Sequence, residues 1–224
     1  MSNNLKKYFR QIIINHFRKR IGAKKFCIIS NDCWGAEIYK LLNRPYNTPF
    51  VGLMMMSPCY IKMLADLKYY LSLPLNFREY SRYPEMQQIE SGIKFPLAVL
   101  GDTDIEIHFM HFRSENEVRE KWARRINRID WQHLFIKYDC GKDYAERKDV
   151  DTFVKMVHLN KLAFGNETFG NKEVIQTKKY SNNGKSQFRN CFLDFNPIEW
   201  LNGNPLYKNV IQKKIIGSLA YKFL

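Results

Sequence analysis

What this sequence lacks excludes several large classes of protein. Its five cysteines are odd in number and no two form a Cys-x-x-Cys pair, which argues against a disulfide framework and a zinc ribbon. No apolar run approaches the roughly 20 residues that span a bilayer, and residues 12–14 are too short a core for a secretory signal. Neither a Gly-x-Gly-x-x-Gly fingerprint nor a P-loop occurs. We therefore expect a cytoplasmic protein without dinucleotide or Walker-type binding.

Acidic residues are missing from the first 31 positions, whereas basic residues are frequent there. The whole chain carries a formal net charge of +14. Such a charge predicts attraction to nucleic acid, an anionic membrane face, a nucleotide or a phosphate-bearing lipid. Because no nucleic-acid-binding motif is present, we expect an anionic phosphorylated substrate as the partner.

Residues 3–21 have the pattern of a basic amphipathic helix. Its apolar residues recur near the helical period: Leu5, Tyr8, Phe9, Ile12, Ile13, Phe17 and Ile21. Two interpretations remain open. The helix lies peripherally on the anionic inner membrane face, or its apolar stripe packs on its own domain. We treat residues 1–25 as this helix and residues 26–224 as a single α/β domain.

Strand and helix patterns alternate along the rest of the chain. We predict strands at residues 26–30, 48–54, 95–100, 105–112, 134–138 and 159–164, and helices at 34–42, 57–71, 114–129, 143–158 and 205–223. Residues 76–94 look irregular, and residues 165–189 look like a long mobile loop. This order predicts an α/β fold with a mixed, mainly parallel sheet, helices on both faces and a hairpin around Gly101.

The first predicted strand is followed by a polar loop that opens a helix. Ligands of such folds usually bind beyond the carboxyl ends of the strands, and free N–H groups at a helix start attract phosphate. We therefore take the loop as a substrate-binding candidate: Ser30, Asn31, Asp32, Cys33, Trp34 and Gly35. The alternatives are a plain helix cap for Asp32 and a core position for Trp34. A helix start would lower the pKa of the Cys33 thiol. Residues 139–141 and 165–167 form polar loops at the same edge.

A second candidate site lies on the strand at 105–112. Asp104, Glu106 and His108 share one face, because side chains alternate along a strand. A carboxylate and an imidazole are costly to bury, so we expect this face to meet water or a polar cleft. Asp104 and His108 are the candidate catalytic bases.

The turn before this strand carries an Asp-x-Asp pattern at Asp102 and Asp104. Many glycosyltransferases use that pattern to hold a divalent metal on a sugar-nucleotide diphosphate, and two nearby carboxylates suit a hard cation. An ordinary turn is the alternative. His111 and Arg113 end the strand and could bind a phosphate.

The helix at 114–129 begins with a capping-box pattern at Ser114 and Glu117. Its charges include three i,i+4 pairs in the favourable orientation, namely Glu115–Arg119, Glu117–Lys121 and Glu120–Arg124. Arg125 and Arg128 lack such partners. We expect Arg124 or Arg125 to help hold phosphates.

Five segments together resemble a bacterial family, domain of unknown function 1919. They are FCIISNDCWG (26–35), TPFVGL (48–53), YIKMLADLKYYL (60–71), FPLAVLGDTDIEIHFMHF (95–112) and EKWARRINRI (120–129). The resemblance covers roughly residues 26–165 and implies an α/β fold. One departure is Cys59, which stands where many members have an acidic residue.

The resemblance also implies a role, because members are often labelled as exopolysaccharide or capsular polysaccharide biosynthesis proteins. We therefore expect a transferase of surface polysaccharide assembly that acts on a nucleotide-activated or lipid-linked phosphorylated sugar. The alternative is a non-catalytic protein of the same pathway that binds carbohydrate or a partner. The family implies no catalytic residues, so the residues proposed above rest on the sequence pattern alone.

Overall fold

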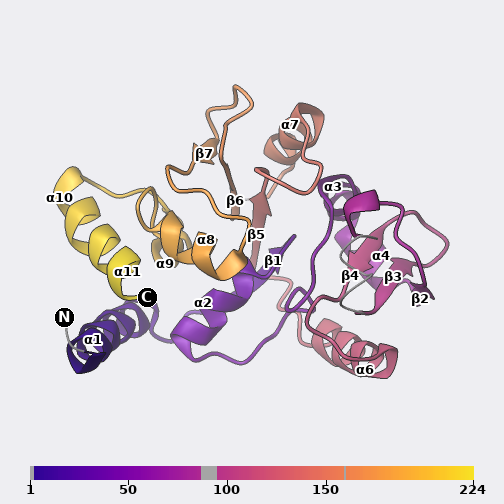
Figure 1. Ribbon diagram of the computed structural model, residues 1–224, viewed down its shortest axis with the longest axis horizontal. Helices are drawn as coiled ribbons and strands as arrows, with labels where there is room; N and C mark the ends of the chain where they lie inside the picture. Colours follow the sequence, from indigo (N-terminus) through magenta and orange to yellow (C-terminus); the bar gives the residue numbers. More distant parts are fainter. Residues whose placement is uncertain (1–2, 87–94, 159) are drawn as a thin grey trace.

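A four-stranded parallel sheet forms the centre of the computed structural model, which describes residues 3–86, 95–158 and 160–224 (Figure 1). The strand order is β1-β5-β6-β7, and every neighbouring pair is parallel. The strands span Cys27–Ser30, Leu134–Asp139, Lys161–Gly165 and Val174–Gln176. Because the four strands are parallel, their carboxyl ends meet at one edge, where the candidate site lies.

Helices cover both faces of this sheet, as the sequence predicted. Ile28 and Phe135 point into one apolar cluster, and Ile29 and Ile136 point into the other, as the alternation along a strand requires. The first cluster includes residues of α2 (Trp34–Leu42), α8 (Gly184–Cys191) and α9 (Pro197–Trp200). The second includes residues of α3 (Ser57–Ala65) and α7 (Arg147–Lys155).

A second, antiparallel sheet is inserted between β1 and β5. Its order is β2-β3-β4, with strands at Leu75–Arg78, Leu97–Leu100 and Glu106–His108. The predicted hairpin is β3–β4, and Gly101 in its turn has a φ of 56°. Helices α4 (Leu67–Ser72) and α6 (Glu115–Ile126) belong to this part of the chain. The prediction of irregular structure at residues 76–94 is wrong at its start, where β2 pairs with β3. Residues 87–94 lie outside the described residues.

Three predicted elements have different bounds in the structure. In place of a strand at 48–54, only Met54 forms a bridge, to His108, because Gly52 turns the chain with a φ of 80°. The helix predicted at 57–71 divides at Asp66, whose carboxylate accepts a hydrogen bond from Tyr69 N (3.2 Å) and caps α4. The helix predicted from 143 starts instead at Arg147.

The segment at 165–189, predicted as one long loop, contains regular structure. Strand β7 and most of α8 fall inside it, and Asn183 caps α8 by accepting a hydrogen bond from Ser186 N (3.0 Å). Strand β7 has only three residues, and a run that short leaves little periodic signal in an Asn-, Gly- and Lys-rich stretch.

Helix α1 (Asn3–Ile21) packs on the rest of the protein. Its apolar face buries Ile13, Ile14 and Phe17, and the Phe17 ring stacks on Phe192 with centroids 5.5 Å apart. It also runs beside the last helical segment, which consists of α10 (Val210–Gln212), the π-helical turn η1 (Lys213–Gly217) and α11 (Ser218–Phe223). Of the two interpretations of this helix, the one in which its apolar stripe packs on its own domain holds for the buried face of α1. Within the described ranges, no helix is both long and apolar enough to cross a membrane.

This packing makes a stability prediction. Replacing Phe17 by alanine should lower the free energy of unfolding by about 3 kcal/mol, because it removes a fully buried ring and leaves a cavity. The matched control is Tyr8→Ala on the same helix, where the side chain is 63% exposed and the change should be small. Chemical denaturation measures both, and equal effects would show that α1 does not depend on this contact.

Candidate functional site

The carboxyl ends of β1 and β5 form a crevice, because the chain leaves these two neighbouring strands toward opposite faces. After β1 it enters α2 in one apolar cluster, and after β5 it enters α7 in the other. Such a division is where ligands bind in open α/β sheets. Two of the polar loops noted in the sequence, after residues 30 and 139, meet at this point.

Asn31 joins the two loops. Its Nδ2 donates to the Asp139 carbonyl (3.0 Å), and its Oδ1 accepts from the Asp139 backbone N–H (3.0 Å). The Asn31 side chain thus satisfies both the backbone N–H and the backbone carbonyl of the buried Asp139, as a neighbouring strand would. This double hydrogen bond fixes the position of the β1 loop relative to the β5 loop.

Two buried ammonium groups hold Asp32. Lys137 Nζ lies 2.6 Å from Asp32 Oδ1, and Lys142 Nζ lies 2.9 Å from Oδ2. Burial alone would raise the pKa of Asp32, but the two lysines hold it well below its usual range. Asp32 also accepts a hydrogen bond from Trp34 N (3.0 Å), so it stabilises the start of α2 as well.

Two further carboxylates surround Lys142. Its Nζ lies 3.8 Å from Asp139 Oδ2 and 3.9 Å from Asp143 Oδ2, and both oxygens are buried without a hydrogen-bond donor in the described part of the chain. Tyr180 OH donates to the other oxygen of Asp139 (2.7 Å). Burial raises the pKa of Asp139, and it raises the pKa of Asp143 to about 7. Asp143 can therefore gain or lose a proton at neutral pH.

The backbone at Asp143 is strained. Asp143 and Tyr144 have φ angles of 58° and 61°, in the left-handed region that non-glycine residues seldom adopt. The Asp143 carbonyl accepts a hydrogen bond from Ser57 N (2.7 Å), which ties this turn to the start of α3. Strained backbone and perturbed pKa values cluster at functional sites, so this turn is a candidate for one.

A cavity of about 420 Å³ lies beside this cluster. Its lining combines the first loop with segments far away in the sequence: Cys33, Ala36, Glu37, Lys40, Tyr46, Val51, Gly52, His111, Asn183, Gly184 and Lys185. The buried carboxylates connect to this lining through Lys142, whose Nζ donates to the Asn182 carbonyl (3.3 Å), next to the cavity-lining Asn183. The predicted substrate-binding residues Cys33 and His111 thus come together here.

The remaining residues of the first loop have structural roles. Trp34 is fully buried among aromatic rings, so its core alternative holds. A side chain at Gly35 would come within 2.9 Å of Ile28, so this position requires glycine. Ser30 Oγ donates to the Asp32 carbonyl (2.9 Å). Burial and the neighbouring Asp32 raise the pKa of the Cys33 thiol to about 11, opposite to the lowering expected at a helix start.

The Asp104 face lies on the second sheet and does not border the crevice cavity. The expectation that Glu106 and His108 meet water is wrong, because both are buried. Residues 81–83 cover them: Ser81 Oγ and Arg82 N donate to the Glu106 carboxylate at 2.7 and 3.0 Å.

Asp104 itself is exposed and ion-paired. Lys62 Nζ lies 2.5 Å and Arg82 Nη1 3.1 Å from its oxygens, and these contacts lower the pKa of Asp104 to about 2. Asp102 is exposed in the preceding turn. Among the residues described, no three His, Cys, Asp or Glu side chains gather where they could hold a metal ion.

The arginines of α6 occupy different environments. Arg125 donates to the Val51 carbonyl (3.0 Å) and lies over the Tyr46 ring, so it supports two residues that line the cavity. Arg124 is exposed, and Arg128 lines a separate cavity of about 270 Å³. Of the three predicted i,i+4 pairs, Glu117–Lys121 is formed, whereas Arg119 lies over the Phe77 ring instead.

Sequence reasoning missed the residues that complete the cluster: Lys137, Lys142, Asp143 and Tyr180. The loop at 139–141 was recognised at the correct edge, so the polar residues directly after it carried a usable signal. A lysine inside an otherwise apolar strand was a second signal, because a buried ammonium group requires a carboxylate partner.

Comparison with known proteins places the whole site within one family. A family model described as "Domain of unknown function (DUF1919)" matches residues 4–202. An uncharacterized protein from Haemophilus influenzae is 30% identical over 160 residues, which cover 71% of each chain. The family match extends beyond residues 26–165, so it also includes α1 and the segment at 180–185 that covers the crevice.

The buried ion pair predicts a large stability effect at Lys137. Lys137→Met should lower the free energy of unfolding by about 3 kcal/mol, because Asp32 stays buried with one of its two cations removed. Lys148→Met is the control: its ion pair with Glu146 is exposed and screened by water, so its loss should change the stability far less. Urea denaturation compares the two, and a loss at Lys137 no greater than at Lys148 would refute a structural role for this pair.

Proposed function

The chain belongs to the DUF1919 family, and on that premise we propose that it is a transferase of surface polysaccharide assembly. Its substrate in this proposal is a nucleotide-activated or lipid-linked phosphorylated sugar. The observation that carries the proposal is the Asp143 carboxyl, which has a pKa of about 7 and lies on strained backbone at the sheet crevice. A base is most effective when its pKa lies near the working pH.

In the proposed reaction an acceptor hydroxyl attacks the activated sugar carbon. Asp143 takes the hydroxyl proton, the oxygen forms the new bond to carbon, and the donor phosphate leaves with the electrons of the broken bond. Lys142, held beside Asp143, contributes positive charge where negative charge develops. The adjacent cavity of about 420 Å³ has room for a sugar ring and contains polar groups from His111 and Asn183.

Asp143 replaces Asp104 as the preferred base for two physical reasons. Asp104 has a pKa of about 2, which makes it a weak proton acceptor, and its two cationic partners occupy its oxygens. Asp143, in contrast, lies beside Lys142, whose Nζ reaches the Asn182 carbonyl next to the cavity that Cys33 and His111 line. The alternative function, a non-catalytic carbohydrate-binding protein, would use the same cavity without proton transfer at Asp143.

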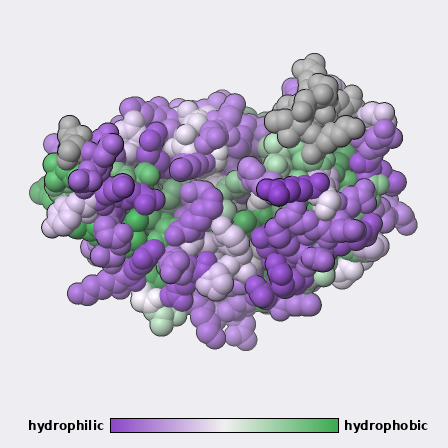
Figure 2. Space-filling view, turned by 60° about the horizontal axis from the view of Figure 1, so that its bottom comes forward, coloured by the Kyte–Doolittle hydropathy of each residue, from purple (hydrophilic) through white to green (hydrophobic). Residues whose placement is uncertain are grey.

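We place this activity at an anionic membrane surface, to which the protein would bind peripherally. The helical segment at 210–223 exposes Val210, Ile211 and Ile215, with Ile211 69% exposed, and α1 beside it exposes Tyr8 and Ile12. Figure 2 shows hydrophobic side chains at this end of the molecule among hydrophilic ones. Residues 203–224 contain four lysines and no acidic residue. Apolar side chains ringed by cations suit an anionic lipid surface.

The transferase proposal predicts a pH-dependent loss in Asp143→Asn. Nucleotide sugars are first screened by thermal shift, and release of nucleotide from the stabilising donor is then followed. The rate of the unchanged protein should rise as the pH passes about 7, because Asp143 is protonated below its pKa and ionised above it. Asp143→Asn should lower the rate by about 100-fold or more and remove this rise.

Asp104→Asn is the matched control, since it removes a carboxylate outside the crevice and should keep both rate and pH profile. If Asp143→Asn binds the donor and the rate is unchanged, the base assignment is wrong. If the donor binds and no nucleotide is released at any pH by the unchanged protein, the non-catalytic alternative replaces the transferase.

Membrane contact predicts binding to vesicles that contain phosphatidylglycerol. Ile211→Glu with Ile215→Glu should reduce co-sedimentation about tenfold or more, because it places acidic charge in the apolar surface. Val157→Glu is the control, as that side chain is 97% exposed outside this surface. Equal sedimentation of both variants would contradict contact through this segment.

A further inference from the structure

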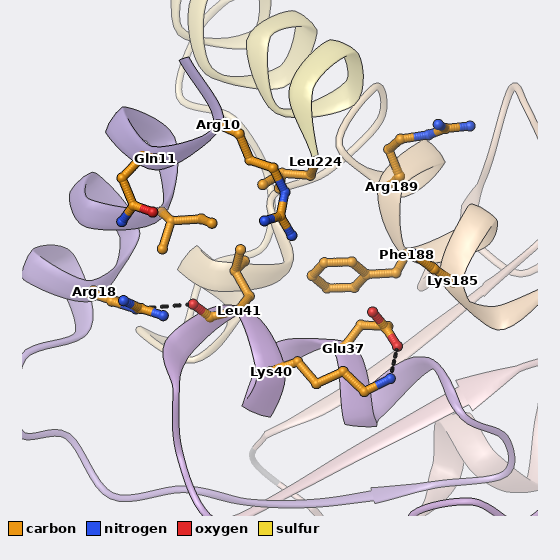
Figure 3. A pocket seen from close by; sticks show the side chains of 11 residues that line it. Arg10, Gln11, Arg18, Glu37, Lys40, Leu41, Lys185, Phe188, Arg189 and Leu224 are labelled. Atoms are coloured by element: carbon orange, nitrogen blue, oxygen red, sulfur yellow. Dashed lines mark hydrogen bonds and ion pairs between the residues drawn. The ribbon is translucent and has the colours of Figure 1, made fainter. Parts of the chain in front are cut away.

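A basic pocket of about 340 Å³ lies between α1, α2, α8 and the end of the chain (Figure 3). Five of its lining side chains are basic, Arg10, Arg18, Lys40, Lys185 and Arg189, and a single one, Glu37, is acidic. These residues come from segments distant in the sequence, so the fold itself brings the charges together. A solvated face of one helix would not explain this convergence.

The positive charges of the pocket are only partly compensated. Lys40 Nζ pairs with Glu37 (2.6 Å), and Arg18 Nε donates to the Leu41 carbonyl (3.2 Å). Arg10 and Lys185, in contrast, have no carboxylate partner within the described part of the chain. Like charges around one pocket repel each other, and an anion between them would relieve that repulsion.

The direction of the Arg10 side chain agrees with an anion at the centre of the pocket. Figure 3 shows the Arg10 guanidinium extending into the pocket toward Phe188 and Glu37, whereas Arg189 extends away from it. The Phe188 ring forms an apolar wall and is almost completely buried. An apolar wall keeps water away from one side of a bound anion, which strengthens its attraction to the guanidinium group.

The basic pocket adjoins the crevice cavity. Glu37, Lys40 and Lys185 line both, so the two cavities are neighbours along α2 and the start of α8. An elongated ligand could place an anionic group at Arg10 while its other end extends toward Cys33 and His111.

We propose that the pocket is a phosphate-binding site, in which Arg10 and Lys185 hold the phosphate or pyrophosphate group of a ligand. Arginine provides a planar fork of donors that matches phosphate oxygens, and lysine adds a point charge. The assignment does not depend on transfer chemistry, because it rests on the charges and walls of this pocket alone. The phosphate can belong to a soluble ligand or to a lipid headgroup.

The test titrates the full chain with inorganic pyrophosphate by calorimetry at physiological ionic strength, where weak surface attraction is screened. Arg10→Gln with Lys185→Gln should weaken binding about tenfold or more, since two charge-assisted contacts are lost. The matched control is Arg78→Gln with Lys172→Gln, which removes the same charge from exposed positions elsewhere. The control should change the dissociation constant less than about twofold.

A second measurement distinguishes the source of the phosphate. Sedimentation with phosphatidylcholine vesicles, with and without phosphatidic acid, uses the same two variants. Binding of phosphatidic acid but not pyrophosphate, lost in the Arg10 and Lys185 variant, would identify a lipid headgroup and support the site. Equal losses in both variants, or no dependence on Arg10 and Lys185 with either probe, would overturn it.

The test of the phosphate site can be distinguished from the test of the proposed transferase function. Asp143→Asn should bind pyrophosphate as the unchanged protein does, because Asp143 does not line the pocket. Loss of activity in Asp143→Asn with retained pyrophosphate binding supports both proposals. Retained binding with no activity in any variant removes the transferase and leaves the phosphate site.

Discussion

The pairing of Asp32 with Lys137 is the constraint on which the centre of this protein depends. Both groups are buried between β1 and β5, where an unpaired charge would be expensive. The pair forms only if the two strands align with Ser30 opposite Lys137, which is the observed register. Asn31 then reaches the backbone of Asp139. The ion pair thus fixes the register of β1 against β5, which apolar packing alone would specify less well.

The same constraint explains the character of the candidate site. Three carboxylates, of Asp32, Asp139 and Asp143, surround the two ammonium groups of Lys137 and Lys142. The lysines neutralise Asp32 most directly, so the excess of acidic groups falls on the other two. Burial then raises the pKa of Asp143 into the neutral range. A structural ion pair and a proton-exchanging group are therefore parts of one network.

The sequence predicted the α/β fold and the first loop because both have local signatures. A strand followed by polar residues and a helix is visible without knowing what lies beside it. Tyr180 had no such signature, since its partner Asp139 lies 41 residues away. The Asp104 face was misjudged for the same reason: nothing local shows that Ser81 and Arg82 fold back over Glu106. Local sequence patterns show where a loop lies, whereas the residues that its side chains contact depend on how the strands are ordered in the sheet.

The insertion of the second sheet between β1 and β5 also bears on how the protein reaches its structure. Asn31 and Asp139 are separated by 108 positions, so their contact closes a very long loop, whereas β5, β6 and β7 are near neighbours in the chain. Contacts of large sequence separation form late, because the entropy of loop closure must be overcome first. During synthesis, β1 leaves the ribosome well before its parallel neighbour β5 exists. We therefore expect the crevice to be among the last features to assemble.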